Sequence, residues 1–381
     1  MYIGETMSHS DLTYWLALKF VENVGNVGFN ALVKTFGSPR AVFDAPAVSL
    51  QEVGRITKKT AHDIQSFDKW ATIENELETA DSLNVSIITS DSSLYPKSLL
   101  NIYDFPPILY VKGTLSDHDI NVAVVGSRRA STYGRFTTER LCRELAMKGV
   151  TVVSGMARGI DSAAHTGAIA GKGRTIAVLG CGIDVIYPPE NKDLFEKITE
   201  NGAVITEFPF STQPLASNFP VRNRIISGIS LGVVVVEASE KSGSLITARV
   251  ALEQGRDVFA VPGNIDSPGT KGTHRLIREG AKLVENTYDI LEEIAPQVNR
   301  NTEVDGSSGE NDISNNAIIP ESFQADTKAI LKLLGREPIH IDTLVAESGY
   351  HVHDVLSILT SLELEGYVKQ LPGKKFVIKE R

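Results

Sequence analysis

Short apolar runs alternate with longer stretches of mixed polar and apolar residues through the middle of the chain. The clearest run, Val122–Val125, is followed at once by Gly126, where the sequence turns polar and basic. Short runs of small and β-branched residues are typical of strands buried on both faces of a parallel sheet. The same pattern predicts strands at 121–126, 151–154, 175–179, 203–206, 232–237 and 257–261. Because helical stretches separate these runs, we predict an α/β fold with a doubly wound, mostly parallel sheet.

Residues 11–69 have the spacing of amphipathic helices, which predicts an all-helical domain before the sheet. Within it, Val24–Gly28 is a glycine turn similar to that of a helix-hairpin-helix, whose backbone amides are offered to a DNA phosphate. A weaker copy with one glycine occurs at Val53–Ile56. The alternative is a SAM-like helical domain that serves packing or partner contacts. After this domain, the prolines of Tyr95–Gly113 predict an extended, edge-like approach to the sheet.

The end of the chain divides into two parts of different composition. Residues 297–320 contain too few apolar residues to pack, so we predict a flexible linker there. Helical spacing at 328–334, 341–346 and 352–364, followed by two short strand-like runs, is the pattern of a winged helix. The predicted domains are therefore the helical domain at 1–80, the core at 81–296, the linker at 297–320 and the winged helix at 321–381.

The composition indicates a globular protein in a reducing environment. The two cysteines, Cys142 and Cys181, form no CxxC motif and no cluster with histidine. This argues against a disulfide framework and against structural zinc, so we expect neither a metal nor a cofactor. No apolar run approaches the ~18 residues of a membrane span, and the chain start lacks the pattern of an export signal. A cytoplasmic location is the expectation.

The acidic excess, a formal net charge of −9, is unevenly distributed. Residues 1–120 carry 9 Lys and Arg against 15 Asp and Glu, and residues 291–381 carry the same numbers. Residues 121–290 carry 20 against 17 and are therefore the net positive segment. An anion-binding surface is thus expected in the segment that holds the predicted parallel strands.

Polar turns that contain glycine follow the predicted strands. The turn Gly126–Arg128 precedes a helix predicted to begin near Ser131, and free amides at a helix start attract anions. A second such turn is 237–244. Because the carboxyl ends of parallel strands meet at one edge of a sheet, these turns are expected to converge on one crevice.

The motifs at these turns belong to blocks that extend over nearly the whole chain. The blocks are Gly126–Gly134, Ser154–His165, Ala177–Pro188, Phe219–Gly228, Val235–Ala248 and Val261–Ile265. In this order they resemble the DNA-processing protein DprA family, also called Smf, of bacterial natural transformation. The resemblance implies an extended Rossmann-like core that binds single-stranded DNA, forms a homodimer and loads the RecA recombinase onto DNA. A helical N-terminal domain and a C-terminal winged helix are variable additions to that core.

The crevice offers cations for phosphates and aromatic rings for bases, as binding of single-stranded DNA requires. The resemblance implies that Arg128 and Lys241 hold phosphates. Arg222 and Arg224 are two residues apart and cannot point the same way, so one is expected to face the crevice and the other a structural carboxylate. The sequence leaves open which of them does so.

Tyr133 and Phe219 are candidates for base stacking, with packing in the core or at the rim as the alternative for both. The expected DNA ligands are thus Gly126, Ser127, Arg128, Arg222, Asn223, Arg224, Lys241, Ser242 and Gly243.

An enzyme is the alternative, because the core also resembles Rossmann enzymes that hydrolyse nucleotide glycosidic bonds. Those enzymes carry a P-G-G-x-G-T-x-x-E turn, and the matching stretch Lys241–Val250 lacks the carboxylate at its end. The chain also lacks a GxxxxGK[ST] motif and a GxGxxG fingerprint after the first parallel strand. Asp161 and His165 are interpreted as a hydrogen-bonded pair that fixes a turn, and not as an acid/base pair. We expect no catalytic residues.

The presumed recognition helix of the winged domain, His351–Leu364, contains no lysine or arginine. Helices that read the major groove usually carry such residues, so we expect protein binding or weak duplex binding there. The expected function of the whole chain is to bind and protect incoming single-stranded DNA and to load RecA onto it, without catalysis.

Overall fold

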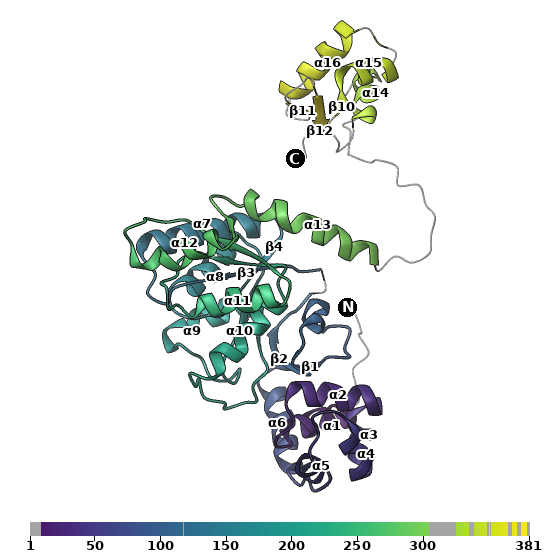
Figure 1. Ribbon diagram of the computed structural model, residues 1–381, viewed down its shortest axis with the longest axis vertical. Helices are drawn as coiled ribbons and strands as arrows, with labels where there is room; N and C mark the ends of the chain where they lie inside the picture. Colours follow the sequence, from purple (N-terminus) through teal and green to yellow (C-terminus); the bar gives the residue numbers. More distant parts are fainter. Residues whose placement is uncertain are drawn as a thin grey trace. The chain divides into compact units, whose positions relative to one another are not determined.

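The computed structural model describes residues 9–116, 118–304, 325–334, 339–348, 350, 352–364, 368–371 and 375–378. Contacts between residues divide the chain into two compact units, Met1–Asp305 and Gly306–Arg381. The first unit contains the helical segment and the large sheet, and the second contains the winged helix (Figure 1).

Nine strands form the large sheet, in the order β1-β2-β6-β5-β4-β3-β7-β8-β9. Their bounds are β1 Ser86–Thr89, β2 Ile108–Gly113, β3 Ile120–Val125, β4 Val150–Ser154, β5 Thr175–Val178, β6 Gly202–Thr206, β7 Gly232–Val235, β8 Asp257–Ala260 and β9 Lys282–Leu283. Neighbouring strands are parallel throughout the part of the sheet that runs β6-β5-β4-β3-β7-β8-β9. The predicted α/β fold with a mostly parallel sheet is confirmed.

The chain changes its direction of growth across the sheet at β3. From β3 it adds β4, β5 and β6 on one side, and it then returns to the other side with β7, β8 and β9. A crevice opens beyond the carboxyl ends of the strands at such a switch point. Because β3 and β7 pair through Val125 and Val235, the loops that follow these residues meet at the same crevice.

Helices cover both faces of the sheet, because alternate residues of β3 point to opposite sides. Val122 and Val124 pack in a cluster with α7, α8 and α13, whereas Ala123 and Val125 pack with η1, α10, α11 and α12. The bounds are η1 Lys97–Asn101, α7 Thr132–Met147, α8 Ile160–Ala170, η2 Pro189–Asn191, α9 Lys192–Glu200, α10 Asn218–Gly228, α11 Ser244–Glu253, η3 Pro268–Thr270, α12 Lys271–Arg278 and α13 Tyr288–Val304.

The segment that contains the prolines differs from its prediction. β2 is not an edge strand, since it lies between β1 and β6 and pairs antiparallel with both. The prolines precede the strand, so they remove no hydrogen bond from its ladder. Tyr95 instead anchors this approach, because its buried hydroxyl donates to the Pro106 carbonyl at 2.6 Å.

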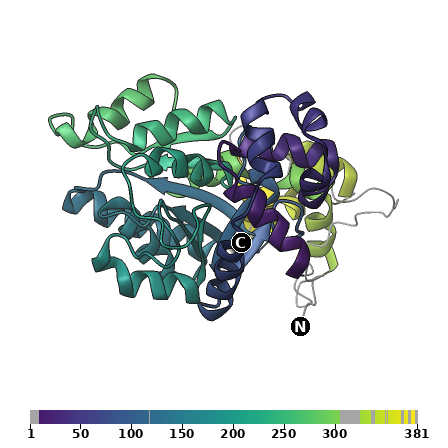
Figure 2. The same ribbon diagram turned by 90° about the horizontal axis from the view of Figure 1, so that it is seen from below.

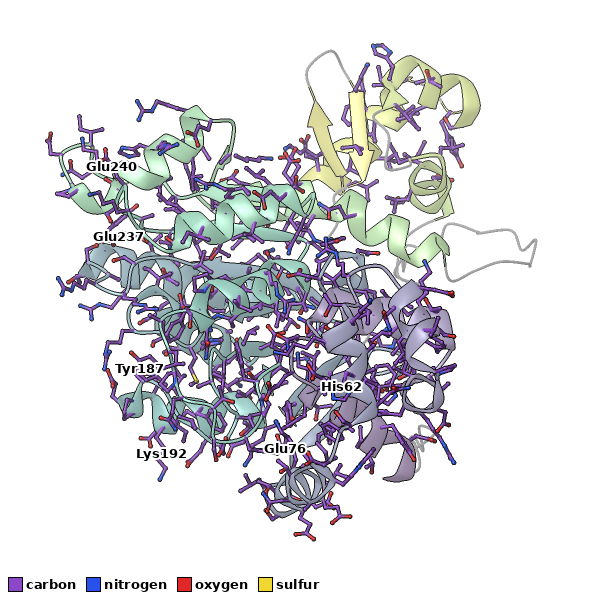
Figure 3. The ribbon with its side chains drawn as sticks, turned by 60° about the horizontal axis from the view of Figure 1, so that its bottom comes forward. His62, Glu76, Tyr187, Lys192, Glu237 and Glu240 are labelled. Carbon is purple, nitrogen blue, oxygen red and sulfur yellow. The ribbon has the colours of Figure 1, made fainter. Side chains whose placement is uncertain are left out.

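From residue 9, where the described part of the chain begins, six helices precede the sheet and lie beside its β1–β2 edge (Figures 1 and 2). They are α1 His9–Phe20, α2 Asn26–Phe36, α3 Pro39–Asp44, α4 Ala47–Glu52, α5 Lys58–Gln65 and α6 Trp70–Ser82. Trp15 and Phe29 stack at 5.4 Å between ring centroids in their core. Glu76 on α6 joins this helical segment to the sheet, because its carboxylate accepts from the Tyr110 hydroxyl at 2.8 Å (Figure 3). Burial raises the pKa of Glu76.

The second unit has the predicted winged-helix arrangement. Its elements are α14 Ala325–Leu333, β10 Ile339–His340, α15 Ile341–Ser348, α16 Val352–Leu364, β11 Val368–Leu371 and β12 Lys375–Ile378. β12 pairs with both β10 and β11, and the short β10 was not predicted. The predicted linker begins too early, because α13 continues to Val304; residues 305–320 lie outside the described part of the chain. Among the residues that the structure describes, no helix is long and apolar enough to span a bilayer.

Candidate nucleic-acid interface

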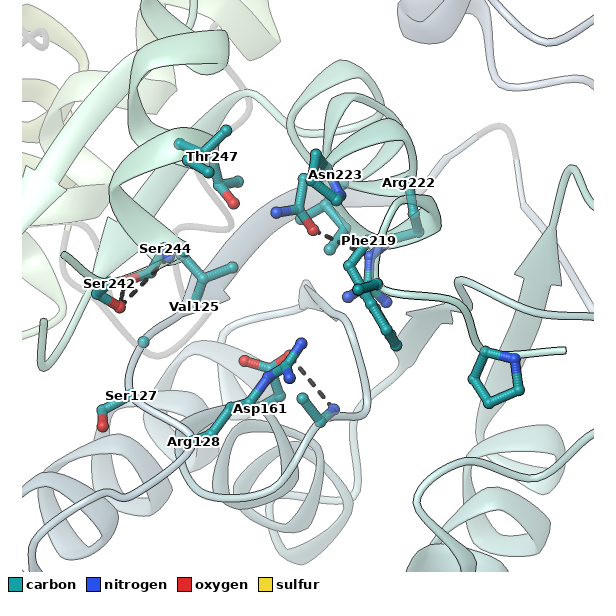
Figure 4. A pocket seen from close by; sticks show the side chains of 18 of the residues that line it. Val125, Ser127, Arg128, Asp161, Phe219, Arg222, Asn223, Ser242, Ser244 and Thr247 are labelled. Atoms are coloured by element: carbon teal, nitrogen blue, oxygen red, sulfur yellow. Dashed lines mark hydrogen bonds between the residues drawn. The ribbon is translucent and has the colours of Figure 1, made fainter.

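A cleft of about 620 Å³ opens beyond the carboxyl ends of β3 and β7. Its walls are the loop after β3, the start of α8, the helix α10 with the chain before it, and the start of α11 (Figure 4). The predicted ligands that line it are Gly126, Ser127, Arg128, Phe219, Arg222, Asn223, Ser242 and Gly243. The switch point of the sheet therefore brings together residues that are more than 100 positions apart.

The start of α8 holds the loop after β3 in place. The amide of Ile160 donates to the Ser127 carbonyl at 3.2 Å, and the Ser127 hydroxyl accepts from the Arg129 amide at 3.1 Å. Gly159 has φ +78°, and a Cβ there would lie 2.3 Å from the Ser127 oxygen. Since glycine is required for this contact, the loop holds Arg128 and Arg129 at the cleft in one backbone arrangement.

The start of α7 is not the free anion site that the sequence predicts. Glu237, which is buried at the end of β7, accepts from the Ser131 amide at 3.0 Å and from the Ser131 hydroxyl at 2.8 Å. Ser131 in turn caps the helix by accepting from the Gly134 amide at 3.0 Å. The protein's own carboxylate thus occupies the positive end of this helix, which excludes a phosphate there.

The start of α11, in contrast, opens on the cleft. Ser242, Gly243, Ser244 and Thr247 line the cleft, and the Ser242 hydroxyl accepts from the Ser244 amide over a long 3.4 Å. A Cβ at Gly243 would meet no protein atom within 4 Å, so this position is open on the protein side. Amides and hydroxyls at a weakly capped helix start are suitable donors for a phosphate.

Phe219 lies between two arginines. The Cζ atom of Arg128 is 4.9 Å from the ring centroid, and that of Arg222 is 5.7 Å away. Tyr187 also contacts the ring, at 5.8 Å between centroids. Since cations stack favourably on aromatic faces, this arrangement fixes the ring and both guanidinium groups at the cleft (Figure 4). The Phe219 ring is half-buried and forms part of the cleft wall.

Arg222 is the buried member of this group. Its side chain donates to the Gly155 carbonyl at 2.9 Å, to the Val178 carbonyl and to the Asn223 side chain at 3.0 Å. Burial lowers the pKa of Arg222 to about 10, so it stays charged at neutral pH. A Cβ at Gly155 would lie 2.6 Å from the Arg222 guanidinium, which explains the glycine.

Arg224 is corrected as a DNA ligand. It points away from the cleft, donates to the buried carboxylate of Glu207, and lies 3.3 Å from Asp104. The structure therefore decides the alternative left by the sequence, because Arg222 faces the cleft and Arg224 the structural carboxylate.

Two other predicted ligands do not line the cleft. Tyr133 is 56% exposed, donates through its hydroxyl to the Pro262 carbonyl at 3.3 Å and does not line the cleft; base stacking on its ring stays a prediction. Lys241 is exposed next to Ser242 but is not among the lining residues.

Asp161 and His165 do not form the predicted pair. Asp161 lines the cleft and accepts from the Ala157 amide at 3.3 Å, which fixes the turn before α8. His165 instead hydrogen-bonds through Nδ1 to the Thr175 hydroxyl at 2.7 Å. Burial raises the pKa of Asp161 and lowers that of His165 to about 3. His165 is therefore a neutral core residue.

The sequence interpretation missed Arg129, Tyr187, Ser244 and Thr247 as lining residues. All four lie inside the sequence blocks named above, but nothing in the sequence shows which of their side chains face the cleft.

The residues of this cleft lie in a stretch that matches one family model. Residues 86–295 match the model described as DNA recombination-mediator protein A. The chain belongs to this family. Residues 319–374 match a second model, the DprA winged helix domain, in agreement with the fold of the second unit.

Relatives in this family match over different shares of the chain. Protein Smf of Escherichia coli (strain K12) is 41% identical over 329 residues, which is 86% of each protein. DNA processing protein DprA of Streptococcus pneumoniae (strain ATCC BAA-255 / R6) is 48% identical over 200 residues, 52% of this chain and 71% of the relative.

Two solved structures of the family are similar to this fold. The X-ray structure of DNA processing protein A from Streptococcus pneumoniae has a TM-score of 0.66 and 36% identity, and covers 74% of this chain and 97% of that one. A structure of DNA processing protein A from Helicobacter pylori, described for its single-stranded DNA binding mode, has a TM-score of 0.51 and 30% identity. It covers 56% of this chain and 96% of that one.

Proposed function

We propose that this protein binds single-stranded DNA in the cleft beyond β3 and β7. The observation that supports this most directly is the stack of Arg128, Phe219 and Arg222, since cations for phosphates and a ring for bases are the recurrent parts of such sites. The related protein from Helicobacter pylori is described by its binding mode for single-stranded DNA.

The proposed roles differ along the cleft. The exposed Arg128 and Arg129 contact phosphates directly, because their guanidinium groups lie at the cleft and are accessible. The buried Arg222 is held by two carbonyls, so it contributes mainly a fixed positive potential. A further phosphate binds at the start of α11, where it accepts hydrogen bonds from Ser242, Gly243 and the α11 amides. Lys241 extends this contact at the rim of the cleft.

Binding assays with different nucleic acids test this function. We expect the full chain to bind a single strand more tightly than a duplex of equal length, with affinity that falls steeply as salt increases. A mononucleotide should compete weakly, because it uses one phosphate contact. Equal affinity for strand, duplex and mononucleotide would contradict the proposal.

Recombination mediation gives the proposed cellular role. The family description names a recombination mediator, so we propose that the protein acts in the cytoplasm as a homodimer, protects incoming DNA in natural transformation and loads RecA onto it. RecA assembly on a protected strand should be faster with this protein present and should depend on Arg128. The winged helix is proposed to serve a partner protein or weak duplex contacts.

We further propose that the cleft performs no catalysis. Hydrolysis of glycosidic bonds normally uses two carboxylates, and Asp161 is the acidic residue that lines this cleft. Burial raises the pKa of Asp161, so this carboxyl group is the candidate acid if the hydrolytic alternative holds. Incubation with nucleoside monophosphates should leave them intact; release of free base that Asp161→Asn abolishes would establish the enzyme instead.

A further inference from the structure

The two glycine turns of the helical segment differ in what they contact. The first contacts the core through the partly buried side chain of Asn26. Its Asn26 amide donates to the Glu207 carboxylate at 3.0 Å and to the Asp104 carbonyl at 3.3 Å. The Lys19 ammonium donates to Asn26 Oδ1 at 2.8 Å. The side chain of this turn is therefore engaged inside the protein.

The second turn is exposed. Gly54 and Arg55 lie on the surface, and the Arg55 Cζ atom is 5.6 Å from the ring centroid of Tyr103. Tyr103 is 72% exposed. One face of its ring carries a guanidinium group, and most of the side chain remains accessible.

Two further cations follow Arg55 in the sequence. Lys58 and Lys59 are exposed in the first turn of α5, the helix that also carries the labelled His62 (Figure 3). Glu52 is an exposed carboxylate in the same region, so the turn has a net positive charge. The exposed tyrosine thus contacts a guanidinium group, and two further cations lie three and four residues after that arginine.

A chain of contacts connects this pair to the cleft. Tyr103 precedes Asp104, whose carboxylate lies 3.3 Å from the Arg224 guanidinium. Arg224 belongs to α10, which also carries Arg222 at the cleft. Tyr103 is therefore connected to the cleft through Asp104 and the α10 helix, which forms one wall of the cleft.

We propose that Arg55, Lys58, Lys59 and Tyr103 form a second contact surface for single-stranded DNA. A base stacks on the accessible face of Tyr103, and the three cations contact the neighbouring phosphates. This rests on the proposed function of the cleft, since the surface holds a strand that has already filled it. The exposed ring favours a single strand over a duplex, whose bases are stacked on each other.

Arg55→Gly and Tyr103→Ala test the surface with little risk to the fold. Arg55 has φ +75°, a conformation that glycine adopts without strain, and Tyr103 is exposed. Arg40→Ala is the matched control, because Arg40 is an exposed arginine of the same segment, also 5.6 Å from a tyrosine ring, that of Tyr14. Arg128→Ala reports on the cleft.

The experiment titrates each full-length variant with thymidine strands from about 4 to about 30 nucleotides, a range that spans common site sizes. Arg55→Gly and Tyr103→Ala should bind the shortest strands like wild type and the longest about tenfold more weakly. Arg55→Gly should also lower the salt slope on long strands by about 0.7. Arg40→Ala should match wild type at every length.

Two results would overturn the inference. If both test variants bind long strands like wild type while Arg128→Ala binds all lengths weakly, the second surface does not exist. The cleft alone then binds the strand. If Arg40→Ala is as weak as Arg55→Gly, general charge and not this surface holds the strand. Normal binding by Arg128→Ala would contradict the proposed function separately.

Discussion

Glu207 and Arg224 form a buried ion pair that joins the cleft helix α10 to the helical segment. The same Glu207 oxygen accepts from Arg224 and from Asn26 of α2. Both charged side chains are less than a tenth exposed. The orientation of α10, and with it that of Arg222 and Phe219, therefore depends on a contact with the N-terminal helices.

The first prediction concerns this pair. Glu207→Gln should lower the free energy of unfolding by up to about 3–5 kcal/mol, because it leaves the buried Arg224 guanidinium with the partly exposed Asp104 as its remaining ion-pair partner. Glu22→Gln is the control, since it breaks the exposed pair with Lys69 and should cost less than about 1 kcal/mol. Urea unfolding measures both. Equal losses would show that the buried pair has no special role.

The second prediction concerns Arg128. Arg128→Ala should weaken single-strand binding about tenfold to a hundredfold, because a charge-assisted contact contributes about 1.5–3 kcal/mol. Arg128→Lys should restore only part of it, since lysine lacks the flat group that stacks on Phe219. Fluorescence anisotropy with labelled strands measures the affinities. Arg140→Ala, which removes an α7 arginine paired with Glu144, should bind normally; a comparable loss there would indicate a non-specific charge effect.

The third prediction separates two glycines of the cleft. Gly243→Ala should fold normally, because the added methyl group meets no protein atom within 4 Å and the backbone is helical. It should weaken binding if a phosphate approaches the start of α11. Gly126→Ala should instead destabilise the fold, because its Cβ would lie 2.6 Å from Ile160. Thermal unfolding and strand affinity, measured on both variants, distinguish these effects; normal affinity of Gly243→Ala would remove α11 from the interface.

The fourth prediction concerns pH. The folded pKa of His165 is about 3, whereas an unfolded histidine has about 6.5, so the unfolded chain binds the proton first. Stability from this group is complete above about pH 6.5 and is lost as the pH falls towards 3, by about 1.4 kcal/mol per unit at most. His165→Gln should flatten this dependence in urea unfolding between pH 7 and 4. An unchanged slope would assign the acid sensitivity to other groups.

The sequence predicted the elements that rest on local patterns. The apolar runs of β3 to β8 specify strands, and the switch point after Val125 follows from their order. The direction of Arg222 and Arg224 could not be predicted, because it depends on Glu207 and on carbonyls from distant strands. The pairing of His165 with Thr175 was missed, since helical spacing suggested Asp161. Side-chain partners that arrive from remote segments leave no local signal.

Glu237 at the start of α7 has a consequence for ligand selection. In dinucleotide-binding folds this helix start receives a pyrophosphate, and here a fixed negative charge fills the same place. We therefore expect a compact diphosphate to be repelled there, whereas an extended strand in the proposed site would distribute its charge over the neighbouring loops. Free nucleotides should then compete poorly with a single strand, because this carboxylate excludes small anions from the helix start.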